Sequence, residues 1–258
     1  MYNTLKKFDG IFLEEMNQVR LMNRQDTKLI LKFNELESVL EAVANDYFVL
    51  EIKGKRLHGY NSLYYDTKNL DAYQEHHNGK LNRYKFRYRS YLGSDLHFFE
   101  IKYKNNKRRT VKKRMETFGI EQSMGRVSKA FLSEKTLVDP ETLHPSLWIN
   151  FDRITLVHRN FSERVTIDMN LGFKPFDKDE LVEHPEMVIV EVKQKRFDRL
   201  SPMIETLHQH QVYPIRISKY CLGVLSTFSG IKRNAFKPKL IRISKIIGND
   251  YYRTLTAS

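Results

Sequence analysis

The chain has 258 residues, enough for one large domain or two small ones. A hydrophobic fraction of 41% supports a packed core and excludes a globally disordered protein. The formal net charge of +13 indicates an anionic partner, which can be nucleic acid, a phosphorylated small molecule, polyphosphate or an anionic membrane surface. Because Cys221 is the only cysteine, an internal disulfide and a zinc site built on several thiolates are excluded.

The sequence shows no targeting or membrane-spanning segment. No run of about 18 apolar residues occurs. Lys6, Lys7 and Asp9 interrupt the first residues, which therefore lack the apolar core of a signal peptide. We expect a cytoplasmic protein. A position at the inner face of the membrane stays open as an alternative. Coupling to a membrane would require a separate membrane-protein partner.

Residues 24–118 are predicted to alternate helices with strands. The predicted elements are a strand at 24–28, a helix at 34–46, strands at 47–53 and 58–66, a helix at 69–78, and strands at 81–92, 96–104 and 107–118. Asn34 and Glu37 have capping-box spacing and precede apolar residues at helical spacing. The last three strands are separated only by short turns, which is typical of antiparallel pairing.

Residues 122–228 continue this pattern. The predicted elements are a helix at 122–134, a loop at 135–145, strands at 147–158 and 163–171, a loop with Pro175 and Pro185, a strand at 187–195, and helices at 202–210 and 219–228. Ser201 and Ser218 are the expected N-caps of the last two helices. We assign residues 1–230 to one domain and residues 231–258 to a basic C-terminal tail. We interpret the tail as a solvated segment, with docking on an anionic membrane or a partner as the alternative.

Charged and apolar side chains alternate along almost every predicted strand. In 83–89, four cations fall on one face and three aromatic rings on the other. The same alternation occurs in six other strands, where the polar residues of each strand share one face. These sets are Arg24, Asp26 and Lys28; Glu100, Lys102 and Lys104; Lys112 and Arg114; Arg153 and Thr155; Arg164, Thr166 and Asp168; and Glu191, Lys193 and Lys195. One such strand is typical of a half-exposed sheet. Its recurrence favours an α+β fold: an antiparallel β-barrel tunnel of about eight strands, with a cationic lumen and amphipathic helices packed outside.

A cationic lumen requires anions. Arginine donates paired hydrogen bonds to phosphate oxygens, and lysine adds a mobile positive charge. The few carboxylates among the cations suit a divalent cation, Mn²⁺ or Mg²⁺, shared with phosphate oxygens. Such a site permits phosphoryl transfer, for which a protein supplies positioning and charge neutralisation. No Gly-x-x-x-x-Gly-Lys-Ser/Thr sequence occurs, so a P-loop is excluded.

Short motifs follow one another in a definite order along the chain. They are Arg24-Gln25-Asp26-Thr27-Lys28, Ser62-Leu63-Tyr64-Tyr65-Asp66-Thr67, Lys85-Phe86-Arg87-Tyr88-Arg89, Glu100-Ile101-Lys102, Arg153 with Arg164-Val165-Thr166-Ile167-Asp168, Glu191-Val192-Lys193 and Ser218-Lys219-Tyr220. This set resembles the triphosphate tunnel metalloenzyme superfamily, and more closely its VTC (vacuolar transporter chaperone) branch, the polyphosphate polymerase domain. Each motif alone is weak, but the ordered set is specific.

The resemblance implies a tunnel that binds the triphosphate of ATP, transfers the γ-phosphate to a growing polyphosphate chain and releases ADP. The implied catalytic cations are Lys28, Arg87, Arg89, Arg153 and Arg164. The other implied phosphate-binding cations are Lys85, Lys102, Arg114, Lys193 and Lys219. Glu191 would be the principal metal ligand, and Glu100 would either bind metal too or orient a lysine by a salt bridge. Asp26 and Asp168 would hold basic side chains, and Arg83, which the motif does not require, is expected at the rim.

The first strand departs from the family pattern. Members that hydrolyse triphosphate carry two glutamates there, where this chain has Arg24 and Asp26. Losing a carboxylate weakens a second metal or water site, which favours a polymerase. Two alternatives stay open: a triphosphatase in which water attacks, and a non-catalytic module that binds polyphosphate or nucleic acid. An enclosed tunnel would exclude duplex DNA, so we expect ATP and polyphosphate as partners and no nucleic acid.

Overall fold

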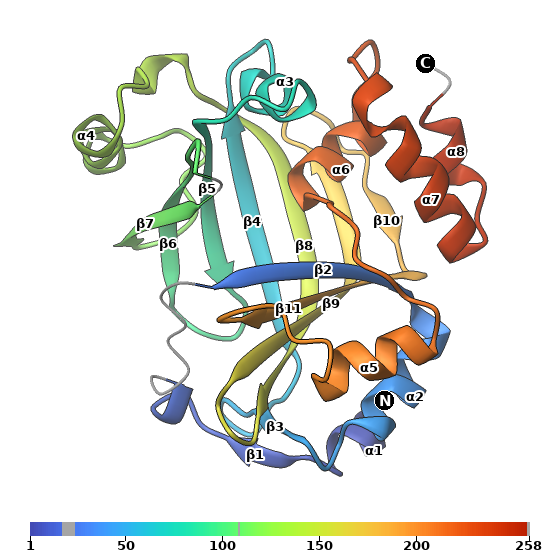
Figure 1. Cartoon of the computed structure of the whole chain (residues 1–258). Helices are drawn as coiled ribbons and strands as arrows, with labels where there is room; N and C mark the ends of the chain where they lie inside the picture. The colour runs from blue at the N-terminus through green and yellow to red at the C-terminus, as the bar shows by residue number, and fades with distance from the viewer. Residues whose placement is uncertain (17–23, 108, 257–258) are drawn as a thin grey trace.

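The computed structural model describes residues 1–16, 24–107 and 109–256. Within these residues, eleven strands form one sheet whose main path is antiparallel (Figure 1). Along this path lie β2 (Gln25–Lys32), β11 (Met187–Gln194), β9 (Glu163–Pro175), β8 (His144–His158), β4 (His58–Asp66), β5 (Arg83–Tyr91), β6 (His97–Lys104) and β7 (Thr110–Thr117). Beside it, β3 (Tyr47–Leu50) pairs with β8 and with β1 (Asp9–Ile11), and β10 (Val182–His184) pairs with β9.

Helices connect the strands and cover both faces of the sheet. They are α1 (Tyr2–Leu5), α2 (Leu36–Ala42), α3 (Asp71–His77), α4 (Arg126–Lys135), α5 (Pro202–Gln209), α6 (Lys219–Thr227), α7 (Lys237–Ile247) and α8 (Tyr251–Thr254), with short 3-10 turns η2 (Phe33–Glu35), η3 (Pro140–Thr142) and η4 (Asn234–Phe236). Ser201 and Ser218 cap α5 and α6 as predicted, by accepting hydrogen bonds from the amides of Ile204 and Cys221. No helix in the described ranges is long and apolar enough to cross a membrane.

Most predicted elements are present, with changes at their ends. The helix predicted at 34–46 is shorter, because η2 precedes α2 and the chain turns after Ala42. Glu37 does not cap this helix: its carboxylate accepts a hydrogen bond from Thr4 at 2.6 Å and tethers α1. β9 continues through the predicted loop as far as Pro175, and β1, β10 and α1 were not predicted.

The sheet is strongly curved but not closed. Its main path ends at β2 and β7, and these two strands do not pair within the described residues, so the predicted barrel is not confirmed. The curvature still brings β2 toward β6, so that Asp26 on β2 lies close enough to Lys102 on β6 for their charges to interact. We call the face that carries Lys28, Arg87 and Arg153 the inner face, and the opposite face the outer face.

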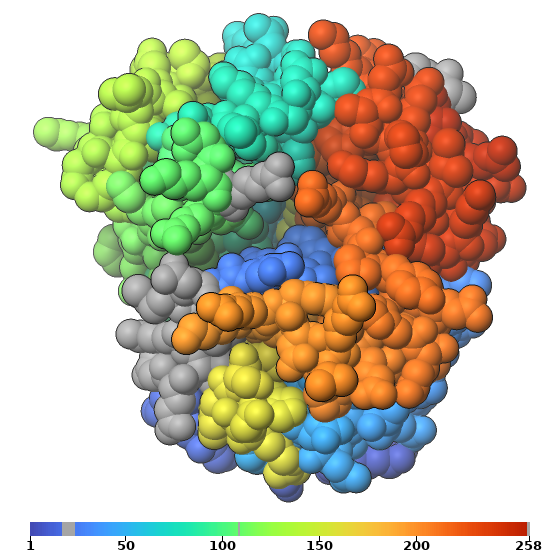
Figure 2. Space-filling model, viewed as in Figure 1, coloured from blue at the N-terminus to red at the C-terminus, as the bar shows by residue number. Residues whose placement is uncertain are grey.

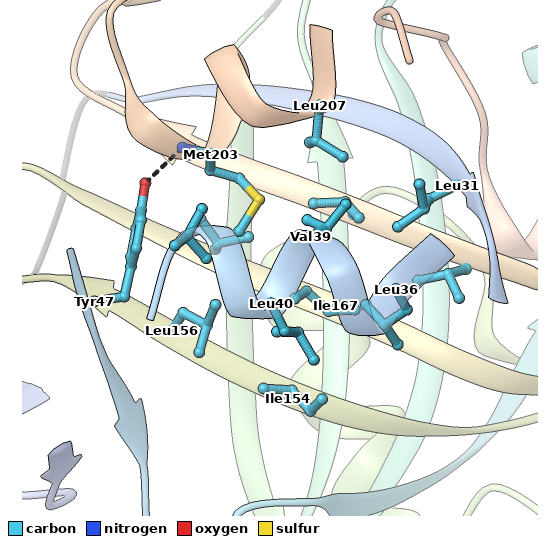
Figure 3. Packing of buried hydrophobic residues seen from close by; sticks show 14 of the residues in the cluster. Leu31, Leu36, Val39, Leu40, Tyr47, Ile154, Leu156, Ile167, Met203 and Leu207 are labelled. Atoms are coloured by element: carbon cyan, nitrogen blue, oxygen red, sulfur yellow. Dashed lines mark hydrogen bonds between the residues drawn. The ribbon is translucent and has the colours of Figure 1, made fainter. Parts of the chain in front are cut away.

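Apolar side chains on the outer face form the main cores. Under α2 and α5, residues such as Leu31, Ile154 and Ile167 pack against Leu40 and Met203 (Figure 3). A second cluster, containing Tyr88 and Phe99, lies on the outer face of β4, β5 and β6. Each fully buried aliphatic side chain stabilises the fold by about 1.5–3 kcal/mol relative to exposure. These helices lie outside the curved sheet, as predicted.

The helices α6 and α7 lie on the inner face, which corrects the prediction that all helices pack outside. Ile30, Ile149 and Ile189 of the sheet share one buried cluster with both helices. α6 approaches the sheet so closely at Gly223 that an added Cβ would lie 2.6 Å from side-chain atoms of Leu147 and Phe173. Any larger residue at this position would have to displace these side chains or the helix.

The C-terminal segment folds back onto α6, so its interpretation as a solvated tail is wrong. Leu240, Ile243 and Tyr252 are buried in the same cluster as α6. Arg233 is also buried and donates hydrogen bonds to the carbonyls of Leu225 and Phe228, at 2.8 and 2.6 Å. These carbonyls belong to the C-terminal end of α6, where a cation is favourable. Periodicity alone did not reveal this packing, because the segment is short and rich in lysine.

Candidate functional site

Strand register brings the predicted cations onto one surface. Side chains of directly paired residues share a face, and Lys193 pairs with Arg164, Arg153 with Asp168, and Lys85 with Lys102. The inner face thus carries Lys28, Lys85, Arg87, Arg89, Lys102, Arg114, Arg153, Arg164 and Lys193. Lys219 joins them from the first turn of α6. Figure 2 shows the surface hollowed between β2 (blue), the β6–β7 hairpin (green) and the orange segment that leads into α6.

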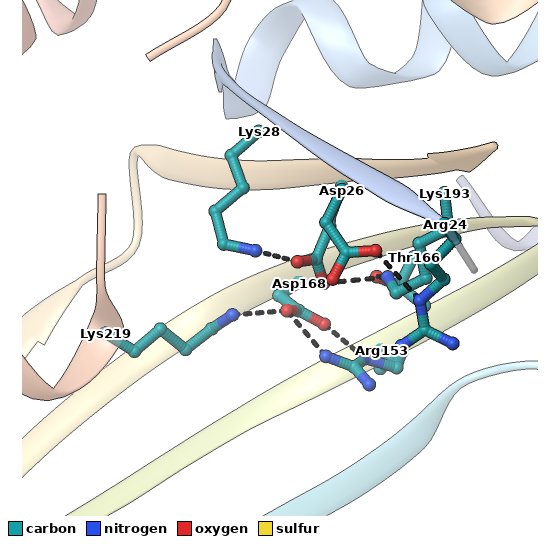
Figure 4. Close-up of polar contacts among 9 residues, drawn as sticks. Arg24, Asp26, Lys28, Arg153, Thr166, Asp168, Lys193 and Lys219 are labelled. Carbon is teal, nitrogen blue, oxygen red and sulfur yellow. Dashed lines mark hydrogen bonds and ion pairs between the residues drawn. The ribbon is translucent and has the colours of Figure 1, made fainter. Parts of the chain in front are cut away.

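Asp168 holds two of these cations (Figure 4). Its carboxylate accepts hydrogen bonds from Arg153 at 2.5 and 2.8 Å and also binds Lys219. Burial opposes ionisation of Asp168, but Arg153 and Lys219 outweigh it and keep the pKa of this carboxyl far below its usual value. Asp168 therefore stays charged and fixes Lys219 of α6 to the sheet.

Glu191 lies between Lys28 of the neighbouring strand β2 and Lys193 of its own strand β11. One carboxylate oxygen contacts Lys28, and the other lies 2.7 Å from Lys193. Lys193 also donates a hydrogen bond to Thr166 at 2.8 Å. Burial and the neighbouring cations lower the pKa of Lys28 and of Lys193 well below the usual lysine value. A further negative charge bound beside them would therefore stabilise the protonated form of each lysine.

Glu100 holds Arg87 of β5 in place. Its carboxylate lies 2.6 Å from Arg87 and also contacts Lys112 of β7. Arg87 donates a second hydrogen bond to the hydroxyl of Tyr64 at 2.6 Å. Burial works against the charge of Arg87, but Glu100 and Tyr64 raise its pKa above the ordinary arginine value. The guanidinium is thus permanently charged and fixed in orientation.

Other cations of the inner face have no carboxylate partner. Among the described residues, no ion pair is formed by Arg89, Lys102 or Arg164. Arg89 is only 7% exposed and is held by a hydrogen bond to Ser62 and by the rings of Tyr60 and Phe151. The Nε of Arg164 is buried without a hydrogen-bond partner. Buried charges are normally paired, so the buried Arg89 and the buried Nε of Arg164, together with the exposed Lys102, indicate a place for an anion.

The pKa values of two lysines on β6 and β7 are lowered by their surroundings. The protein atoms packed around Lys102 in the curved sheet, together with Arg87 and Lys85, lower its pKa to about 7, although the side chain is exposed to solvent. Burial lowers the pKa of Lys112 to about 8, although Glu100 acts in the opposite direction. Near neutral pH these lysines are partly uncharged, and an anion bound beside them would draw protons onto them.

The carboxylates determine which metal the site can hold. In the described part of the chain, no group of three or more His, Cys, Asp or Glu side chains could hold a metal ion. Glu191 fits a hard cation that takes its other oxygens from phosphates and water, as Mg²⁺ commonly does. Burial and neighbouring cations lower the pKa of its two lysine partners, so a bound cation would replace their contacts with Glu191 more easily than those of ordinary lysines. Glu100 fits less well, because it is almost fully buried and contacts Arg87 and Lys112.

Sequence reasoning missed several supporting residues. Lys112 lies on the expected face, but only its contact with Glu100 shows what it does. Tyr64 was assigned only to a motif, yet it binds Arg87 and stacks on Tyr220 of α6 at 5.0 Å. Thr166 likewise supports Lys193. Each of these roles depends on side-chain directions across strands far apart in sequence.

The chain is similar in structure to two solved proteins at low sequence identity. HpAC1, a putative adenylyl cyclase from Hippeastrum described as having a dominant triphosphatase activity, is 12% identical over 80% of this chain and 97% of its own, with a TM-score of 0.49. The PH1819 protein of Pyrococcus horikoshii OT3 is 17% identical over 77% of this chain and 97% of its own, with a TM-score of 0.42. At these TM-scores neither likeness carries a conclusion about activity. A search of curated proteins found no match.

The family comparison is more decisive. The sequence model of the VTC domain matches residues 23–228, which is most of the chain. The match includes every strand of the main path and α6, and it stops before the segment that folds back onto α6. The chain therefore belongs to the VTC domain family.

Proposed function

We propose that this protein is a metal-dependent polyphosphate polymerase that transfers the γ-phosphate of ATP to a growing polyphosphate chain. The observation that carries the proposal is a set of three inner-face cations that form no ion pair within the described part of the chain, Arg89, Lys102 and Arg164. Phosphate oxygens match the donors of arginine and neutralise several charges at once. The family membership is consistent with this reading.

The inner face has the parts that phosphoryl transfer needs. Arg87 and Arg153 are oriented by Glu100 and Asp168, so they can donate to phosphate oxygens without reorganising. In the reaction, a terminal oxygen of the polyphosphate chain forms a bond to the γ-phosphorus of ATP. The bond between that phosphorus and the β–γ bridging oxygen breaks, and ADP leaves with the electron pair. The attacking oxygen is already ionised, so the reaction needs no serine, cysteine or histidine nucleophile.

Glu191 is the residue proposed to hold Mn²⁺ or Mg²⁺, with Glu100 as a weaker candidate. When bound, such an ion would neutralise charge on the transferring phosphate. The remaining work falls to the protein: Lys28 and Lys193 bind phosphate oxygens beside Glu191, and Lys219 does so from α6. A phosphate chain between β2 and the β6–β7 hairpin would neutralise both ends of the open sheet and draw it toward the predicted tunnel.

Incubation of the purified chain with ATP and Mn²⁺ tests the proposal. Products are resolved on a gel stained for polyphosphate, and free phosphate and ADP are measured in parallel. The proposal expects long chains and ADP in step with chain growth. Free phosphate without chains would instead indicate the triphosphatase. If neither product forms, both enzyme functions fail, and the non-catalytic binding module remains.

A further inference from the structure

A second group of cations continues from the inner face to the surface beside α6. Arg83 lies two residues before Lys85 on the same face of β5, a step of about 7 Å along the strand, and it is buried and donates a hydrogen bond to the carbonyl of Lys80. Lys104 is paired with Arg83 on β6. Arg216 precedes α6, and Lys239 lies in the first turn of α7. We call Arg83, Lys104, Arg216 and Lys239 the rim patch.

The rim patch is physically continuous with the phosphate site. Arg216 and Lys239 line the same small cavity as Ser218 and Cys221 at the start of α6. Ser218 in turn accepts a hydrogen bond at 2.7 Å from Lys85, whose backbone lies opposite Lys102 of the inner face. The charges of Arg216 and Arg83 also act on Lys239. A linear anion lying on the inner face would therefore meet this patch as it leaves beside α6.

Two members of the patch are available to a ligand. Arg216 is exposed, and within the described residues neither Arg216 nor Lys239 forms an ion pair. Lys239 is held with its Nζ 5.0 Å from the centre of the Phe236 ring, which fixes its position near Arg216. Phe236 and Lys239 lie outside the residues matched by the VTC model, in the segment that follows them.

We infer that the rim patch binds the polyphosphate chain outside the transfer site, along the path by which the chain leaves. This inference rests on the proposed function for the identity of the ligand. Short anions such as tripolyphosphate occupy the inner face alone, whereas a long chain reaches both surfaces. The C-terminal segment then retains the growing chain between transfers, and longer products accumulate.

Binding measured without catalysis tests this inference. End-labelled long-chain polyphosphate and tripolyphosphate are titrated into the full chain by fluorescence anisotropy and calorimetry, respectively, over a range of salt concentrations. The test variant is the double substitution Arg216→Gln, Lys239→Gln. The matched control is Lys245→Gln, Arg253→Gln, which removes the same charge from a different depression on the C-terminal segment.

The test variant should bind the long chain roughly tenfold more weakly. Its plot of log affinity against log salt should be shallower by about 1.4, at ~0.7 for each lost phosphate contact. Its affinity for tripolyphosphate should match that of the control. Equal affinity of test and control variants for the long chain would overturn the inference. The inference would also be overturned if the test variant lost binding only to vesicles of anionic lipid, titrated in parallel. That result would assign the patch to a membrane. If the chain-length effect is present but ATP yields no polymer, the rim patch stands and the polymerase proposal fails.

Discussion

The inner face has two halves that differ in what fills them. On four adjacent strands the inward side chain changes from apolar to charged over a single step: Ile30 to Lys28, Ile189 to Glu191, Leu171 to Asp168 and Phe151 to Arg153. The apolar half is filled by α6 and α7. In the cationic half the carboxylates of the described residues are too few to neutralise the arginines and lysines, which favours an anion from outside the chain as its partner.

This difference separates stability from binding. The apolar half gains free energy from burial against a helix that is always present. The cationic half costs stability until an anion arrives, because crowded cations in a curved sheet repel one another. Lys219 stands at the border, since it is carried by α6 and paired with Asp168 of the sheet. Substitutions in the apolar half should therefore lower stability and leave activity, whereas substitutions in the cationic half should lower activity and leave the fold.

The largest expected effect is on stability, from the apolar half. Phe173→Ala leaves a cavity beneath α6 and should lower the free energy of unfolding by about 3–5 kcal/mol. Polyphosphate synthesis well below the melting temperature should change little. Urea unfolding and activity are measured on the same preparation. Normal stability with lost activity would show that the two halves are not separable in this way.

A loss of turnover of about 10²–10³-fold is expected for Arg87→Ala, because a fixed, charged donor to phosphate is removed. Glu100 keeps Lys112 as a partner, so the variant should fold. Arg126→Ala, an exposed arginine on α4, is the control. Steady-state rates measure turnover, and circular dichroism measures whether each variant is folded. Full activity of Arg87→Ala would remove the inner face from the mechanism.

Glu191→Gln should split activity from binding. Turnover should fall by about 10²-fold because the proposed metal ligand is lost. Without metal, tripolyphosphate should bind more tightly than to the wild type, since Lys28 and Lys193 lose a competing carboxylate. Affinity is measured in the presence of a chelator. A parallel loss of affinity would mean that Glu191 organises the lysines rather than holding metal.

The smallest expected effect is a pH dependence of stability. The pKa of Lys102 is about 7 in the fold, against 10.5 in a free lysine. Between about pH 7 and pH 10 the unfolded chain therefore binds more protons, so the stability of the empty protein should rise with pH. In Lys102→Met this rise should be smaller. Melting temperatures at the two ends of the interval test it, and an unchanged rise would refute the assignment to Lys102.

The residues of the inner face were predicted better from the sequence than were the closure of the sheet and the helices that pack on that face. Alternation with a period of two is local, so the cations on β5, β9 and β11 were placed on the correct face from their spacing alone. Closure of the sheet depends on how β2 and β7 approach, and nothing local encodes it. The packing of α7 was missed because its buried Leu240 and Ile243 are interspersed with lysines.

Calorimetric titration of tripolyphosphate into the full chain tests the central claim most directly. The account predicts saturable binding with uptake of protons, seen as a binding enthalpy that depends on the buffer, because partly neutral lysines become charged. In Arg87→Ala, Arg153→Ala the binding should be lost while the fold is retained. Undiminished binding by this double variant would contradict the claim that the inner face is the phosphate site.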